Sequence, residues 1–236
     1  MTTLETGGLN RVFDSFDQAI ETLLMTLEAR DLELHRHAHR VAQYAVQIAV
    51  RLGLDARLRE QIHYGALLHD IGHIGIPDGI LHKPTALTAQ EWEEVKLHTV
   101  IGEHICRALP CAAPFLPLIR SHHERLDGTG YPDGLRGPAI PVAVRILAVA
   151  DVYDSLRSHR VHRAGLGHQD ALAILRREAA HGWWDAASVE QMAALNLPDS
   201  DFRPLMTTYD AQSGRFLPVT ELWDDTLLGQ ASQQAA

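Results

Sequence analysis

The sequence lacks several features that mark secreted, membrane-embedded or nucleic-acid-binding proteins. Its 236 residues contain only two cysteines, Cys106 and Cys111, and their spacing fits neither a disulfide framework nor a zinc ribbon. No apolar run approaches the roughly 20 residues that span a bilayer. Residues 1–10 lack the basic and then apolar pattern of a signal peptide. The net charge of −9 disfavours polymeric nucleic acid as a partner. We expect a cytoplasmic protein that has no membrane segment.

Strand patterns are also scarce, because apolar and polar residues rarely alternate. Apolar residues recur instead every three or four positions, as in the ranges 14–30 and 33–52. An apolar content of 46% is enough for a substantial core. The sequence therefore predicts an all-α bundle. Further helices are expected to carry His69-Asp70, to run from residue 88 to about 109, to start at Pro141, and to cover about 168–180 and 186–195.

Three segments are expected along the chain. Residues 1–27 form an N-terminal helix that could serve dimerisation, and residues 28–195 form the main domain. Residues 196–236 form a small C-terminal extension, with an irregular or hairpin structure near 207–219 and disordered last residues.

The range 62–77 organises the rest of the chain. Its first half has helical spacing, which places His69 on the apolar stripe that faces the core. Asp70 follows at once, and Gly72 and Gly75 end the helix. A buried carboxylate is costly unless a cation lies beside it. This His-Asp pair therefore favours metal binding over the alternative of a satisfied core histidine.

Other potential metal ligands fall on inward helix faces or at helix ends: Glu33, His37, His98, His122, His123 and Asp151. With His69 and Asp70 they make five imidazoles and three carboxylates, too many to satisfy one another by ordinary hydrogen bonds. Such a mixture suits iron, manganese or zinc better than magnesium or calcium. Asp70 is the expected bridge between two ions. Six other histidines are interpreted as surface residues: His35, His39, His63, His162, His168 and His181.

These residues belong to a series of motifs that occur in a fixed order between about Glu28 and Asp185. The series comprises Glu33…His37, His69-Asp70-Ile71-Gly72, Lys83-Pro84, His98, His122-His123-Glu124, Gly130-Tyr131-Pro132 and Arg145…Asp151. In order and spacing it resembles the HD-GYP branch of the HD phosphohydrolase superfamily. The resemblance implies a metal-dependent phosphodiesterase that hydrolyses cyclic di-GMP to linear pGpG or GMP. It also implies two or three transition-metal ions, iron or alternatively manganese, held by the eight potential ligands.

The same resemblance implies a substrate site. Gly130 and Tyr131 match the loop that meets the guanine base, and an aromatic ring can stack on a base. Arg160 and Arg163 match basic positions near the substrate phosphates, and a guanidinium group suits phosphate. The plainer alternatives are an ordinary loop aromatic and a solvated basic turn. Homodimerisation and signalling partner proteins are further expectations.

His73 departs from the pattern, because the family usually has lysine at this position. We expect its ring to face the metal site and His69, Asp70 and His73 to be the catalytic residues. A histidine carries less positive charge than a lysine at neutral pH, so we expect a slow enzyme. Residues 157–163 also depart from the usual basic segment. Two alternatives remain open: a silent receptor for the dinucleotide, and a phosphodiesterase for another cyclic dinucleotide such as cyclic GMP-AMP.

Overall fold

The computed structural model describes residues 5–159, 164–195, 197, 209–210 and 215–216, with side chains for residues 16–159, 164–195 and 197. The chain divides into two compact units, residues 1–199 and 200–236, which are considered separately. In the second unit, β1 (Tyr209–Asp210) pairs antiparallel with β2 (Arg215–Phe216). This short pair lies where the sequence predicts a hairpin.

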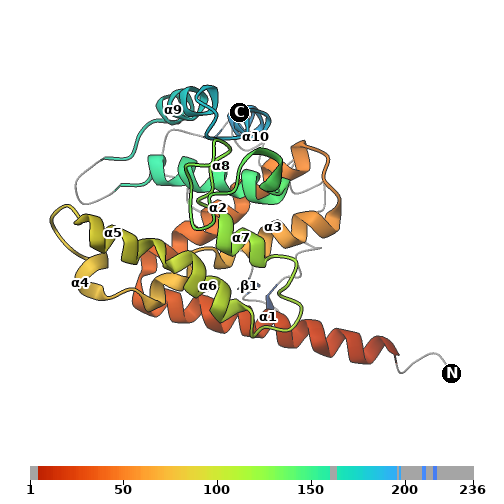
Figure 1. The fold of residues 1–236 in the computed structure, drawn as a ribbon. Helices are drawn as coiled ribbons and strands as arrows, with labels where there is room; N and C mark the ends of the chain where they lie inside the picture. Colours follow the sequence, from red (N-terminus) through yellow and green to blue (C-terminus); the bar gives the residue numbers. More distant parts are fainter. Residues whose placement is uncertain (1–4, 160–163, 196, 198–208, 211–214, 217–236) are drawn as a thin grey trace. The chain divides into compact units, whose positions relative to one another are not determined.

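The described part of the first unit is a bundle of helices, which confirms the predicted all-α class (Figure 1). Four helices build its centre: α1 (Glu5–Arg30), α2 (Leu32–Arg51), α3 (Ala56–Leu68) and α8 (Val142–Arg157). Shorter elements surround them: η1 (Ile71–Gly75), α4 (Asp78–Leu81), α5 (Ala89–Lys96), α6 (His98–Cys106), α7 (Leu116–Ser121), η2 (Gly137–Ala139), α9 (His168–Ala180) and α10 (Ala186–Ala193). No helix among the described residues is both long and apolar enough to cross a bilayer.

Helix α2 lies at the core and packs against α1, α3, α8 and α10. Val41, Tyr44 and Ile48 recur at helical spacing and are almost fully buried. Tyr44 meets Tyr153 of α8 edge to face, with ring centroids 5.2 Å apart. The same stripe continues to His37 at the start of the helix, so the packing that buries α2 also turns this imidazole inward.

Some boundaries differ from the expected ones. The capping box of Thr88 and Glu91 is present, but the helix that it opens ends at Lys96 and a separate helix begins at His98. The two helices pack on different partners, since α5 lies against α4 and α6 lies against η1. The segment between α3 and α5 contains the short helix α4, and the helix that was expected to carry His69-Asp70 ends at Leu68.

Gly72 allows η1 and α6 to approach each other closely. A Cβ atom on Gly72 would overlap the carbonyl oxygen of His98 and the backbone nitrogen of Gly102. Both obstacles are backbone atoms, so a side chain at position 72 could be accommodated only if one element moved. This contact places Asp70 and His73 next to His98.

Gly72→Ala is expected to destabilise the fold by about 2 kcal/mol or more, because overpacking against backbone is poorly relieved. Gly79→Ala is the matched control, since a Cβ atom at Gly79 meets open space. Chemical denaturation of both variants measures the difference. An unchanged free energy of unfolding in Gly72→Ala would contradict the close approach.

Candidate metal centre

Asp70 is the residue on which the site converges. It follows α3 directly, and only 7% of its surface is exposed. Its Oδ2 lies 3.3 Å from Nε2 of His69 and 3.8 Å from Nε2 of His37. Its Oδ1 lies 3.3 to 3.6 Å from the Nε2 atoms of three other histidines: His98, His73 and His122. The two carboxylate oxygens therefore face different sets of imidazole nitrogens.

Three of these imidazoles are oriented by the backbone at helix ends. In His69, His98 and His122, Nδ1 donates a hydrogen bond of 2.7, 2.7 and 2.9 Å to the carbonyl oxygen three residues earlier. Carbonyl groups in the last turn of a helix lack intrahelical partners and accept such bonds. A hydrogen on Nδ1 leaves the lone pair on Nε2, which is the atom that points at Asp70.

The packing of these nitrogens fits a bound cation. Nε2 of His98 lies 3.2 Å from Nε2 of His122. Because Nδ1 of each ring donates to a carbonyl, two lone pairs face each other at this distance. They repel unless a positive charge lies between or beside them. In addition, the buried Nε2 of His69 has no hydrogen-bond partner within the described residues.

Two groups of potential ligands share Asp70. One comprises Asp70, His98, His122 and His123, and the other comprises His37, His69 and Asp70; within each group the ligand atoms lie within 4.8 Å of one another. Asp151 of α8 adjoins them, with one oxygen 3.1 Å from Nε2 of His37 and the other 3.8 Å from Nδ1 of His123. A carboxylate shared by two groups has the arrangement that bridges a pair of metal ions.

The electrostatics of the site match this arrangement. Burial alone would raise the pKa of Asp70 and of Asp151, yet the neighbouring imidazoles hold both pKa values well below their usual range. Burial alone would lower the pKa of His37, but its bonds to carboxylates raise it to about 10. Burial lowers the pKa values of His122 and His123. The ionised carboxylates attract positive charge, and the lowered pKa values favour neutral His122 and His123, the form that binds metal. His37 would have to release its proton to bind an ion.

Asp154 is a functional candidate that the sequence analysis missed. It is 1% exposed, and its Oδ2 accepts a 2.7 Å hydrogen bond from Nδ1 of His37. Arg40 donates to both of its oxygens, at 2.8 and 3.0 Å. A carboxylate on the outer nitrogen of a metal-binding histidine orients the ring. The available signal was spacing: Asp154 lies one turn after Asp151, and Arg40 one turn after His37.

Glu33 lies apart from the two ligand groups. One of its oxygens accepts a 2.8 Å bond from Arg40, and its side chain is 58% exposed. The structure thus gathers seven of the eight expected ligands and leaves Glu33 one turn before His37, on the Arg40 guanidinium. Its role as a ligand of a third ion stays a prediction.

His73 and Tyr131 adjoin the ligand groups. The ring of His73 stacks on His98 with centroids 4.2 Å apart and planes at 9°. The Tyr131 ring lies 4.8 Å from that of His123. Gly130 is in tight contact with the preceding turn, where a Cβ atom would meet backbone atoms of Arg125. Arg160 and Arg163 lie outside the described residues.

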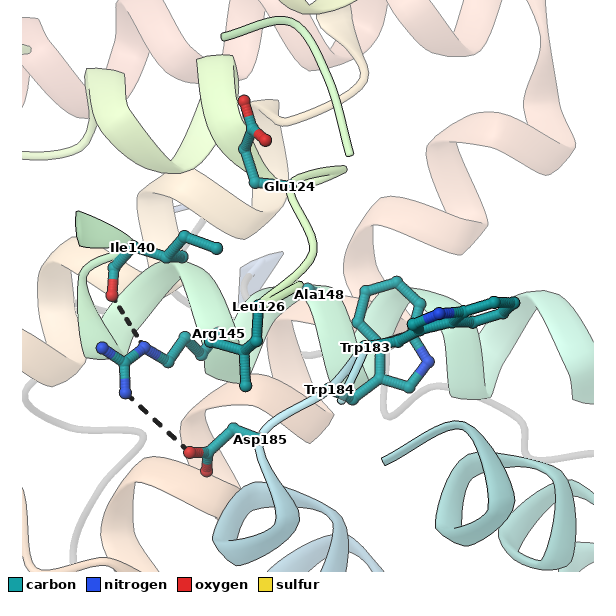
Figure 2. A pocket seen from close by; sticks show the side chains of 8 residues that line it. All are labelled: Glu124, Leu126, Ile140, Arg145, Ala148, Trp183, Trp184 and Asp185. Atoms are coloured by element: carbon teal, nitrogen blue, oxygen red, sulfur yellow. Dashed lines mark hydrogen bonds and ion pairs between the residues drawn. The ribbon is translucent and has the colours of Figure 1, made fainter. Parts of the chain in front are cut away.

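The loop that carries Tyr131 is held from within by Glu124, a buried carboxylate that accepts hydrogen bonds from the backbone nitrogens of Asp133 and Leu135 at 2.7 and 2.9 Å. Behind it is a cavity of about 10 Å³, room for about one water molecule (Figure 2). Its lining comprises Glu124, Leu126, Ile140, Arg145, Ala148, Trp183, Trp184 and Asp185. This cavity is too small for a nucleotide.

Two histidines that were expected at the surface are buried. His168 is 6% exposed, and its Nδ1 lies 2.8 Å from the hydroxyl oxygen of Tyr153. His63 is 7% exposed and lies on α3. The surface interpretation is therefore wrong for these two residues. Each falls on the inward stripe of its helix, where packing decides its exposure.

Asp154→Asn is expected to weaken metal binding about 10- to 100-fold, because a neutral amide accepts a weaker hydrogen bond from His37 and cannot accept both hydrogen bonds of Arg40. Asp170→Asn, an exposed position on α9, is the charge-matched control. Competition titration in metal buffers gives both affinities, and thermal unfolding checks that each variant is folded. Equal affinities in a folded Asp154→Asn would remove this residue from the site.

A sequence profile of the HD domain family matches residues 21–188. A cyclic di-GMP phosphodiesterase of Thermotoga maritima is 43% identical over 154 residues, covering 64% of this chain and 41% of that protein. A 3'3'-cGAMP-specific phosphodiesterase of Vibrio cholerae is 38% identical over 178 residues, covering 74% of this chain and 38% of that protein. This chain thus spans about two fifths of the length of either relative.

The fold comparison agrees with the sequence comparison. A Bdellovibrio bacteriovorus structure described as an HDG"Y"P protein superimposes with a TM-score of 0.54 at 22% identity, over 68% of this chain and 51% of that one. At this identity the likeness concerns the fold. One conclusion follows from the profile match over most of the chain, together with the His69-Asp70 pair and the ligands that converge on it. The chain belongs to the HD domain family.

Proposed function

We propose that this chain is a metal-dependent phosphodiesterase that hydrolyses cyclic di-GMP to linear pGpG, to GMP or to both. The observation that carries the proposal is the single carboxylate of Asp70 shared by two groups of imidazole ligands. Similarity to relatives named as cyclic di-GMP phosphodiesterases supports this substrate class. Relatives named as specific for 3'3'-cGAMP make that dinucleotide the second candidate substrate.

The proposed cofactor is two or three iron ions, with manganese as the alternative. The nitrogen and carboxylate donors suit both metals. His98, His122 and His123 would hold one ion, His37, His69 and Asp151 the other, with Asp70 between them. When bound, the ions supply positive charge to the phosphoryl oxygens and make water more acidic.

The remaining chemistry is assigned to residues of the chain. Tyr131, with Gly130 before it, receives a base of the substrate, and Arg160 and Arg163 bind phosphate. His73 hydrogen-bonds the attacking water and orients it. Its Nε2 lies 3.5 Å from Asp70, so a water between the ligand groups is within its reach. Asp70 and His69 hold the reacting centre in place.

The metal count tests the cofactor assignment. Protein purified without oxygen is expected to contain two or more transition-metal ions per chain, and Asp70→Ala is expected to lose most of them because one carboxylate serves both groups. Elemental analysis measures this, with Asp170→Ala as the control. Glu33→Ala is expected to lower the count by about one if Glu33 leaves Arg40 for a third ion. Full occupancy in Asp70→Ala would eliminate the bridge.

Turnover decides between an enzyme and a receptor. At matched metal content, the wild-type protein is expected to hydrolyse cyclic di-GMP. The variant His73→Lys is expected to be faster, because a permanent cation adds charge stabilisation, and His73→Ala is expected to be slower. Cyclic GMP-AMP is assayed in parallel to rank the two bases. Tight binding without hydrolysis by the fully metallated wild-type protein would establish the receptor instead.

We also propose a cytoplasmic location and a segment organisation of 1–27, 28–195 and 196–236. Residues 1–27 would join two chains in a homodimer, and signalling proteins would bind the assembled domain. The exposed Met25 of α1, with 59% of its surface accessible, supports an apolar contact on this helix. Gel filtration with light scattering, on the whole chain and on Met25→Glu, tests the dimer.

A further inference from the structure

Lys96 is a cation beside Tyr131 that the proposed chemistry leaves without a role. It is the last residue of α5, two positions before His98. Its ammonium nitrogen lies 5.6 Å from the centroid of the Tyr131 ring, within cation–π range. The same ring lies 4.8 Å from that of His123, a potential metal ligand. Lys96 therefore borders both the aromatic residue and the ligand groups.

Other basic side chains near the site are held by the protein itself. Arg40 bonds the buried Asp154, and Arg120 forms a two-bond pair with Asp133. Arg145 donates to the carbonyl oxygen of Ile140 at 2.7 Å. These guanidinium groups each serve a structural contact, and moving one of them would break it.

The ion pair of Lys96 is of a different kind. Its partner Glu93 is one turn earlier on α5, at 2.7 Å, and the Glu93 side chain is 68% exposed. Exposed pairs of this type contribute little, so the ammonium exchanges partners easily. A lysine also has a long flexible chain and acts as a compact point charge for phosphate. Lys96 can therefore move from the Tyr131 ring to a nearby anion.

Resting on the proposed function, we propose that Lys96 binds a phosphate oxygen of the nucleotide whose base stacks on Tyr131. In the free protein the ammonium lies over the Tyr131 ring. An arriving base takes this place, and the ammonium moves toward the sugar-phosphate backbone of the nucleotide. The protein carries a net charge of −9, so a local cation at the entry to the site counters the repulsion of an anionic substrate. Lys96 thus determines affinity for the nucleotide, and the ligand groups determine turnover.

The test compares four variants of the full chain at equal metal content. Lys96→Gln is expected to raise KM for cyclic di-GMP about tenfold or more, because a charged hydrogen bond is lost. Its kcat should change far less. Lys96→Arg is expected to restore most of the affinity. Arg57→Gln, an exposed position in the first turn of α3, controls for the loss of one positive charge.

Glu93→Gln is expected to change KM in the opposite direction. It removes the carboxylate that competes for Lys96, so KM is expected to fall several-fold. A KM in Lys96→Gln no higher than in Arg57→Gln, or an increase in Glu93→Gln, would overturn the proposal. Calorimetric titration with cyclic di-GMP under non-turnover conditions measures dissociation constants, which are expected to rank the variants in the same order as KM. If the wild-type protein binds but does not hydrolyse, the phosphodiesterase function fails while the ranking still tests Lys96.

Discussion

The burial of the Asp70 carboxylate is the constraint on which the rest of the site depends. An ionised carboxylate inside a protein is tolerated only when hydrogen-bond donors or cations surround it. Here five imidazole Nε2 atoms approach its two oxygens within 3.3 to 3.8 Å. These imidazoles come from four regions of the sequence, so the bundle must assemble before they can hold a cation that compensates the charge. The fold and the proposed chemistry therefore depend on the same contact.

The ligands are held firmly because backbone groups orient them. The Nδ1 hydrogen bonds of His69, His98 and His122 end at carbonyl groups near helix ends, and that of His37 ends at Asp154. Each ring thus has one nitrogen assigned to the protein and one directed at the cluster. Such outer contacts determine the tautomer and limit rotation of the ring. Helix termination and ligand orientation are achieved by the same residues.

Much of this site could be predicted from the sequence, and the exceptions have physical causes. His69 and Asp70 were recognisable because they continue an apolar stripe into a glycine-rich helix end, and the all-α class followed from the helical period. The break at Leu97 was missed because it depends on α5 and α6 packing against different neighbours. Asp154 was missed because a carboxylate on a helix is usually exposed to solvent. Its partner Arg40 is distant in the sequence, and only the fold places the two side chains together.

The opposed nitrogens of His98 and His122 would link the stability of the protein to its metal supply. Without a cation between or beside them, their repulsion raises the free energy of the folded state and disappears when the protein unfolds. A metal ion that binds the native state but not the unfolded chain stabilises the protein by mass action. Protein made when metal is scarce would unfold more often and be degraded sooner. Metal supply would then govern the abundance of the protein as well as the activity of each molecule.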